Sequence, residues 1–130
     1  MLLNSSILIV DDDEDDRLLL QQAFHHFNFH DITLFDDGYK VLDYLDKEAS
    51  VLPKLMVSDF NMPTLTGAQL LIKVKENDKL RAIKVYILST SNLKSQIEDC
   101  LKQVAAGYYV KPTSIDGLLE MTKKLINTLN

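Results

Sequence analysis

Short hydrophobic runs alternate with segments of helical periodicity along the whole chain. Five runs are apolar enough to form buried strands, and they cover residues 7–10, 32–35, 55–58, 85–89 and 108–111. The run at 32–35 is short and partly polar, which is typical of an edge strand. Between the runs, apolar residues recur every three or four positions, as on the buried face of an amphipathic helix. This alternation predicts five βα units, (βα)5, around a parallel sheet.

The periodic segments also predict which helical side chains face the core. The inward residues expected along the five helices are, in order, Leu19, Leu20, Ala23, Phe24 and Phe27; Val41, Leu42 and Leu45; Leu70, Leu71 and Val74; Ile97, Leu101 and Val104; and Ile115, Leu118, Leu119, Thr122, Leu125, Ile126 and Leu129. Thr113 or Ser114 is expected to cap the last helix. Right-handed crossovers place the helices on both faces of the sheet, which predicts a three-layer α/β sandwich.

Composition and charge narrow the class of protein. The chain has 130 residues, 46% hydrophobic and 25% charged, which predicts one globular domain over residues 1–130. The net charge is −5, and the unbroken run of acids at 11–16 disfavours nucleic acid as a ligand. No stretch has the length of a membrane span or the pattern of a signal peptide. Cys100 is the only cysteine, so we expect a cytoplasmic protein in which Cys100 is a small apolar helix residue.

Reactive polar residues stand at the ends of three predicted strands. Asp11 and Asp12 follow the first strand, Asp59 follows the third, and Lys111 ends the fifth. In a parallel α/β sheet the ligand crevice lies outside the carboxyl ends of the strands, so these side chains are expected to meet there. Three carboxylates beside one ammonium repel one another unless a cation joins them. The pattern predicts a chemical site.

Several short motifs, taken in order, resemble one family. They are Val10-Asp11-Asp12, Ser58-Asp59-Phe60-Asn61-Met62-Pro63 with Gly67 after it, Ser89 at the end of the fourth strand, and Lys111-Pro112. Together they resemble the receiver domain of two-component response regulators, the CheY-like family, over about residues 7–129. The resemblance implies a flavodoxin-like sheet with strand order 2-1-3-4-5. Because the chain ends after the fifth helix, we expect the single-domain type, with no output domain.

The resemblance assigns roles to the acidic residues. Asp59 is implied to be the phosphoacceptor, whose carboxylate forms an acyl phosphate once the arriving charge is neutralised. Asp11 and Asp12 match the acidic pair that holds Mg²⁺ together with Asp59 and the backbone carbonyl of Asn61. By this match, Asp12 is expected to bind the ion directly, and Asp11 is expected to act through a water molecule. The acids at 13–16 are interpreted as helix N-terminal residues stabilised by the helix dipole.

The resemblance also implies residues that bind the phosphoryl group and respond to it. Lys111 matches the lysine that pairs with the acceptor and then with a phosphoryl oxygen, and Ser89 matches the hydroxyl residue that hydrogen-bonds the phosphoryl group. Tyr108 matches the aromatic switch residue. The Lys111-Pro112 step matches one at which a cis peptide bond is frequent. No further catalytic residue is predicted.

These assignments predict a signalling module that is not an enzyme acting on external substrates, although it catalyses its own phosphorylation and dephosphorylation. Its partners are expected to be a histidine kinase or phosphotransfer protein and a downstream protein target. An aspartyl-nucleophile phosphatase is an alternative, but that class typically requires a second Asp where Asn61 stands. A phosphorylation-independent pseudo-receiver is another, but it usually lacks an acid or the lysine. Because Gly107 stands where several relatives use an acid to dimerise, we expect a monomer or weak homodimer.

Overall fold

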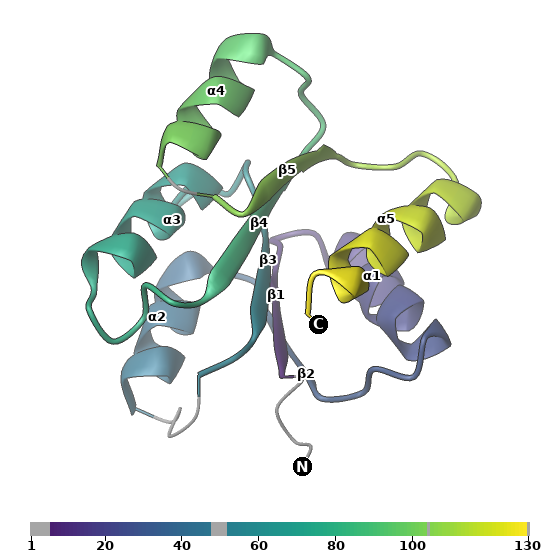
Figure 1. Cartoon of the computed structure of the whole chain (residues 1–130), viewed down its shortest axis with the longest axis horizontal. Helices are drawn as coiled ribbons and strands as arrows, with labels where there is room; N and C mark the ends of the chain where they lie inside the picture. The colour runs from purple at the N-terminus through teal and green to yellow at the C-terminus, as the bar shows by residue number, and fades with distance from the viewer. Residues whose placement is uncertain (1–5, 48–51, 104, 130) are drawn as a thin grey trace.

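Figure 1 shows a central sheet with helices on both of its faces. The computed structural model describes residues 6–47, 52–103 and 105–129, so the expected inward position of Val104 lies outside the described residues. Within them the elements are β1 (Ile7–Val10), α1 (Glu14–His26), β2 (Ile32–Phe35), α2 (Gly38–Lys47), β3 (Leu55–Asp59), α3 (Gly67–Glu76), β4 (Lys84–Ser89), α4 (Lys94–Lys102), β5 (Gly107–Val110) and α5 (Ile115–Asn127).

The sheet is parallel, and its strand order is β2-β1-β3-β4-β5. This order confirms the predicted flavodoxin-like fold. β1 and β3 are buried along their whole length, which explains their uninterrupted apolar sequence. β2 is an edge strand whose residues are only partly buried, as its mixed sequence predicts. β1 and β3 are neighbours, with Val10 beside Ser58, so the residues that follow them meet at one end of the sheet.

Each face of the sheet carries its own hydrophobic core. On one face, α1 and α5 cover Ile7, Ile9 and Val57, with Phe24 and Leu125 fully buried between the layers. On the other face, α2, α3 and α4 cover a second core, which includes Cys100. The two helix layers lie on opposite sides of the sheet in Figure 1. The three-layer sandwich is therefore confirmed, as is the helical position of Cys100, which is buried.

Side-chain caps fix where three helices begin. The Asp13 carboxylate accepts the backbone N–H of Asp16 at the start of α1. Thr66 and Gln69 form a reciprocal capping box at the start of α3. Ser114 accepts the N–H of Gly117 and caps α5, which confirms one of the two predicted capping residues. Among the described residues, no helix is both long and apolar enough to cross a lipid bilayer.

Three residues that were predicted to face the core are exposed instead. The exposed fractions are 42% for Leu19, 50% for Leu101 and 61% for Ile115. Leu101 follows Cys100, which is the only buried residue of α4, so this helix contacts the sheet along a very narrow stripe. Ile115 is the first residue of α5, and it precedes the buried stretch that begins further along the helix. Met121, which was not predicted, is buried there in addition to Thr122.

Candidate functional site

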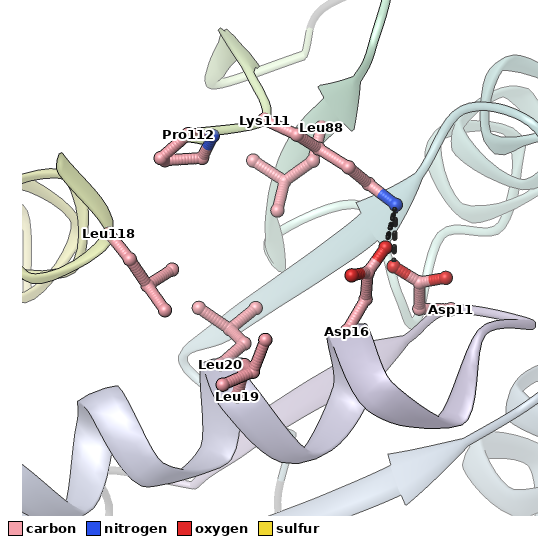
Figure 2. A pocket seen from close by; sticks show the side chains of 8 residues that line it. All are labelled: Asp11, Asp16, Leu19, Leu20, Leu88, Lys111, Pro112 and Leu118. Atoms are coloured by element: carbon pink, nitrogen blue, oxygen red, sulfur yellow. Dashed lines mark hydrogen bonds and ion pairs between the residues drawn. The ribbon is translucent and has the colours of Figure 1, made fainter. Parts of the chain in front are cut away.

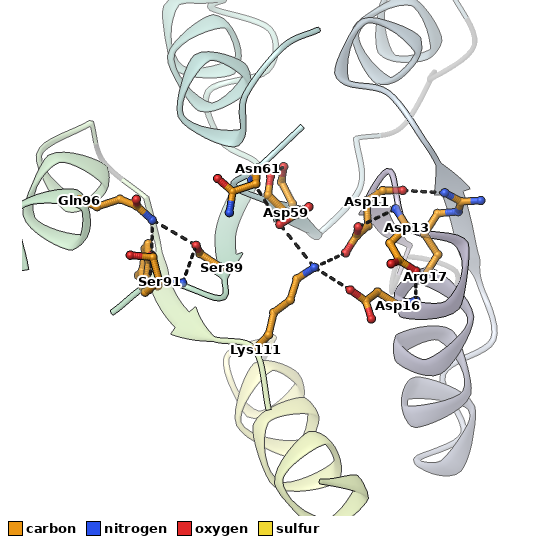
Figure 3. Close-up of polar contacts among 12 residues, drawn as sticks. Asp11, Asp13, Asp16, Arg17, Asp59, Asn61, Ser89, Ser91, Gln96 and Lys111 are labelled. Atoms are coloured by element: carbon orange, nitrogen blue, oxygen red, sulfur yellow. Dashed lines mark hydrogen bonds and ion pairs between the residues drawn. The ribbon is translucent and has the colours of Figure 1, made fainter. Parts of the chain in front are cut away.

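Three carboxylates lie together at the carboxyl end of the sheet. Oxygen atoms of Asp11, Asp12 and Asp59 lie within 4.8 Å of one another. Asp11 directly follows β1, and Asp59 is the last residue of the neighbouring β3. Asp11 and Asp59 are each 5% exposed, whereas Asp12 is open to solvent. The structure therefore brings together the three acids that the sequence predicts at this edge; Figure 3 shows Asp11 and Asp59 there.

Lys111 places its ammonium among the carboxylates. Its Nζ lies 2.9 Å from Asp11 Oδ2, 2.8 Å from Asp16 Oδ2 and 3.5 Å from Asp59 Oδ1. The backbone N–H of Lys111 donates to the carbonyl of Ser89 (2.8 Å), so pairing between β4 and β5 continues up to the site. The side chain of Lys111 is only 17% exposed. The predicted meeting of Lys111 with Asp59 is confirmed as a contact.

Asp16 is a site residue that sequence reasoning missed. It was interpreted as one of several acids stabilised by the helix dipole, but its carboxylate forms the shortest of the three contacts with Lys111. The Asp13 cap begins α1 directly after β1 and sets the first helical turn, in which Asp16 lies. Asp16 and Lys111 are separated by 95 residues, so no local pattern links them.

Burial and like charge control protonation at the site. Burial, together with the nearby negative charge of Asp11, raises the pKa of Asp59 to about 7, although Lys111 opposes this shift. Burial also raises the pKa of Asp11, against the lowering effect of the Asp13 N–H and of Lys111. For Lys111, burial alone favours the neutral form, but its hydrogen bonds to Asp16 and Asp11 prevail and raise its pKa. Lys111 is therefore a permanent cation, and Asp59 titrates near neutrality.

Backbone and side-chain contacts hold Asp11 in one orientation. Its Oδ1 accepts the backbone N–H of Asp13 (3.0 Å), and its Oδ2 accepts Lys111. Its backbone carbonyl accepts a hydrogen bond from Nη1 of Arg17 (2.7 Å). Arg17 thereby joins α1 to the end of β1, a role that its place in the sequence did not reveal.

The loop after Asp59 is packed against the strand ends. The N–H of Phe60 donates to the carbonyl of Leu88 in β4 (2.7 Å), and the N–H of Asn61 donates to Asp59 Oδ1 (3.3 Å). Gly67 begins α3 directly beside this loop. A Cβ at Gly67 would lie 2.4 Å from the backbone oxygen of Asp59 and 2.9 Å from the Cα of Phe60, so only glycine fits without displacement.

A second polar network lies at the end of β4. Ser89 is fully buried, and its Oγ accepts hydrogen bonds from the backbone N–H of Ser91 (3.1 Å) and from Nε2 of Gln96 (3.2 Å). The same Nε2 lies 2.5 Å from the phenol oxygen of Tyr108, which donates to the carbonyl of Ser91 (2.7 Å). The structure thus connects the predicted residues Ser89 and Tyr108 through Gln96, which sequence reasoning missed.

A small pocket opens beside Lys111, between α1 and α5. Its volume is about 60 Å³, and it is lined by Asp11, Asp16, Leu19, Leu20, Leu88, Lys111, Pro112 and Leu118 (Figure 2). Leu19 is exposed because its side chain lines this opening. All described peptide bonds are trans, including that between Lys111 and Pro112, so the cis bond implied by the resemblance is absent.

The donor set fits a hard divalent cation. The cluster holds the carboxylates of Asp11, Asp12 and Asp59, and the Lys111 ammonium contacts Asp11 and Asp59 as well as Asp16, which lies outside the cluster. Oxygen ligands of this kind are those that Mg²⁺ and Mn²⁺ prefer. The raised pKa of Asp59 reflects burial and the same excess of negative charge, which a cation at Asp11, Asp12 and Asp59 relieves.

The family model and the relatives with similar sequences all indicate the same protein family. The model of the response regulator receiver domain matches residues 7–123. The two-component response regulator ORR5 of Oryza sativa subsp. japonica is 32% identical over 95 residues, covering 73% of this chain and 69% of that protein. ORR11 of Oryza sativa subsp. indica is 40% identical over 81 residues, or 62% of this chain. That alignment spans only about half (54%) of ORR11.

Solved structures agree with this result. The phosphorylated cyanobacterial phytochrome response regulator RcpA has a TM-score of 0.87 and 26% identity, covering 97% of this chain and 94% of its own. The Mn(2+)-bound form of response regulator Rcp1 has a TM-score of 0.83 and 25% identity, covering 93% of this chain and 91% of its own. The similarity therefore extends over nearly the whole chain.

Proposed function

Because the chain belongs to the response regulator receiver domain family, we propose that it accepts a phosphoryl group on Asp59 in a Mg²⁺-dependent reaction. The observation that carries this proposal is the setting of Asp59. Its carboxylate is almost fully buried, lies 3.5 Å from the Lys111 ammonium and belongs to a cluster with Asp11 and Asp12. This arrangement supplies a nucleophile together with the charges that an arriving phosphoryl group needs.

The donor is proposed to be a phosphohistidine on a histidine kinase or phosphotransfer protein, the partners with which receiver domains of this family interact. An oxygen of Asp59 attacks phosphorus, the bond from phosphorus to the histidine nitrogen breaks, and the imidazole takes up a proton. The product is an acyl phosphate on Asp59. The carboxylate must be ionised for this attack, because a protonated carboxyl is a poor nucleophile. Burial and Asp11 raise the pKa of Asp59 to about 7, whereas Lys111 favours the ionised form.

The acidic residues are proposed to hold the metal. Asp11, Asp12 and Asp59 would provide carboxylate oxygens, and Asn61 would provide its backbone carbonyl. When bound, the ion would neutralise charge on the phosphoryl oxygens. Lys111 would hold another of those oxygens, and the Ser89 hydroxyl a third. From the family resemblance, Asn61 and Ser91 are proposed to flank the water that later hydrolyses the acyl phosphate, and the chain would thereby catalyse its own dephosphorylation.

The output is proposed to be a partner-binding surface that changes on phosphorylation. Tyr108 is linked through Gln96 to Ser89, and it lies in β5 beside α4. The surface over α4 and β5 carries exposed apolar side chains, with Leu93 63% exposed, Leu101 50% and Val110 46%. We propose that these side chains, on two neighbouring elements, contact the protein partner.

Phosphorylation by a small donor tests the proposal. Wild-type protein incubated with acetyl phosphate and Mg²⁺ should gain one phosphoryl group, detected by intact-protein mass spectrometry. Asp59→Asn, which preserves shape but removes the nucleophile, should gain none. Asp15→Asn is the matched control, because Asp15 is an exposed acid on the first turn of α1. Equal labelling of Asp59→Asn and wild type would refute Asp59 as the acceptor.

A further inference from the structure

The hydrogen-bond network at the end of β4 has only one consistent arrangement of protons. The phenol of Tyr108 has a single proton, and the carbonyl of Ser91, 2.7 Å away, can only accept it. The phenol oxygen must therefore act as the acceptor toward its other neighbour, Gln96, at 2.5 Å. This requirement places the amide nitrogen of Gln96, and not its oxygen, against Tyr108.

The second hydrogen of the Gln96 amide then fixes the role of Ser89. That hydrogen is directed at Ser89 Oγ (3.2 Å), and the backbone N–H of Ser91 donates to the same atom (3.1 Å). A hydroxyl oxygen has two lone pairs, and these two donors occupy both. The hydroxyl proton of Ser89 therefore remains available for donation, and Ser89 can form a further hydrogen bond only to an acceptor.

We infer that Gln96 is a positioning residue whose side-chain amide commits the Ser89 hydroxyl to act as a donor toward the group bound at Asp59. This inference rests on the proposed phosphorylation of Asp59. An aspartyl phosphate presents acceptor oxygens, and a hydroxyl whose proton is already free for donation does not have to exchange hydrogen-bond roles to bind one. In Figure 3, Ser89 lies between Gln96 and Asp59.

The same amide connects the phosphoryl site to the output surface. Gln96 lies in α4, Ser89 ends β4 and Tyr108 lies in β5, so one nitrogen joins three elements. If Ser89 moves toward a phosphoryl oxygen and keeps its hydrogen bond to Gln96, the Gln96 side chain follows it. Movement of Gln96 then changes the hydrogen bond between Gln96 and Tyr108. Gln96 is thus the link through which a shift of one hydroxyl reaches α4.

Gln96→Glu tests the inference, because it exchanges the amide for a carboxylate of the same shape. A carboxylate cannot donate, so it accepts the Ser89 proton and competes with the phosphoryl mimic. Beryllofluoride binding in the presence of Mg²⁺, measured by calorimetry, should weaken about tenfold, since a hydrogen bond to a charged group is lost. Gln103→Glu is the matched control, because it makes the same exchange at an exposed position at the end of α4. It should bind within about twofold of wild type.

A Ser89→Ala background separates hydroxyl positioning from simple charge repulsion. Gln96→Glu should have no further effect in that background, whereas repulsion between the introduced carboxylate and the bound anion would persist. If Gln96→Glu is poorly folded by its melting curve, Gln96→Leu replaces it. That variant removes both donors without adding charge, and it should weaken binding by about threefold only when Ser89 is present.

Each outcome has a defined meaning. Weakened binding that depends on Ser89 supports the inference. Unchanged binding by Gln96→Glu, or an equal loss in the Ser89→Ala background, overturns it while leaving the proposed function intact. Failure of the wild-type protein to bind beryllofluoride overturns the inference, and phosphorylation by acetyl phosphate shows independently whether Asp59 is the acceptor.

Discussion

The ammonium of Lys111 lies between carboxylates that have different functions. Asp11 and Asp59 belong to the acidic cluster, whereas Asp16 comes from the first turn of α1 and is more exposed. Lys111 therefore contacts both the acidic cluster and a carboxylate outside it. Removal of a cluster carboxylate and removal of Asp16 should therefore affect ligand binding differently. The pH dependence that the pKa of Asp59 causes is the most direct measurement.

Mg²⁺ affinity should rise with pH. Burial and the charge of Asp11 raise the pKa of Asp59 to about 7, so below that pH the carboxyl must lose a proton before it can bind a metal. The affinity should increase by up to about tenfold per pH unit below the pKa and level off above it. Calorimetric titrations between about pH 6 and about pH 8 measure this. Asp59→Asn should show a much flatter profile, and an equally steep profile in that variant would contradict the assignment.

Asp16→Asn should strengthen binding of a phosphoryl mimic. Without the charge of Asp16, Lys111 is free to turn toward Asp59, and the potential around the site becomes more positive. Because the side chain of Asp16 is 41% exposed and therefore screened, we expect beryllofluoride affinity to rise by only about two- to fivefold. Asp15→Asn, with the same charge change one residue earlier, should leave the affinity unchanged. Weaker binding by Asp16→Asn would show that Asp16 supports the active position of Lys111.

Residues that end strands could be predicted from the sequence, whereas residues that reach the site from helices could not. Asp11, Asp59 and Lys111 meet because parallel strands end at the same edge, and this rule needs no knowledge of side-chain orientation. Asp16 and Gln96 lie on helices, where the distance to the sheet depends on how each helix packs. Their partners are also fixed by the fold and not by a local motif, so the sequence offered no signal for them.

At the scale of elements, α3 begins very close to the backbone of Asp59 and Phe60. Gly67→Ala should lower the free energy of unfolding by about 1–3 kcal/mol, because the added methyl meets backbone atoms that cannot rotate away. Chemical denaturation measures this change. The variant should also be phosphorylated more slowly, since the displaced atoms include the backbone of Asp59. Gly117→Ala is the control, because its nearest contacts are the side-chain atoms of Ser114 and Pro112 at 3.1 and 3.3 Å. Equal stability of Gly67→Ala and wild type would contradict the close approach.

The helix faces show where periodicity predicts burial and where it does not. Leu70, Leu71 and Val74 of α3 are fully buried, as predicted, because this helix packs closely on the sheet. Leu101 in α4 was predicted from the same kind of spacing but is exposed, because α4 is attached mainly through Cys100. A periodic pattern identifies the apolar side of a helix but does not indicate how much of that side the sheet covers.

Because α4 is weakly attached to the sheet, we expect activation to change the conformation of α4 and β5 most. Addition of beryllofluoride and Mg²⁺ should produce the largest distal amide shifts in residues 93–103 and 105–110, which include α4 and β5. The network of Ser89, Gln96 and Tyr108 connects these elements to the site, and few buried contacts resist their movement. Heteronuclear NMR of the amides measures the shifts, and α2 serves as an internal reference. Shifts confined to the surroundings of Asp59 would show that this chain lacks the switch.

At the scale of the whole molecule, the acidic cluster predicts that a cation stabilises the fold. We expect Mg²⁺ to bind the native arrangement and to relieve repulsion among Asp11, Asp12 and Asp59, so it should raise the melting temperature. At a concentration about 100 times the Kd, the stabilisation should approach about 2.7 kcal/mol. Asp12→Asn should lose most of this response, whereas Asp15→Asn should keep it. An unchanged response in Asp12→Asn would place the metal elsewhere.

The contacts of Lys111 also determine when the site becomes complete during protein synthesis. The ammonium joins residues that are 95 and 100 positions earlier in the chain. As the polypeptide leaves the ribosome, Asp11, Asp16 and Asp59 all emerge before their common cation. A nascent chain that has not reached residue 111 lacks the counterion of Asp11, Asp16 and Asp59. If Asp59 is the acceptor, as proposed, interrupted translation products should be unable to build the phosphoryl site, and a truncated chain should not draw phosphoryl groups away from full-length copies.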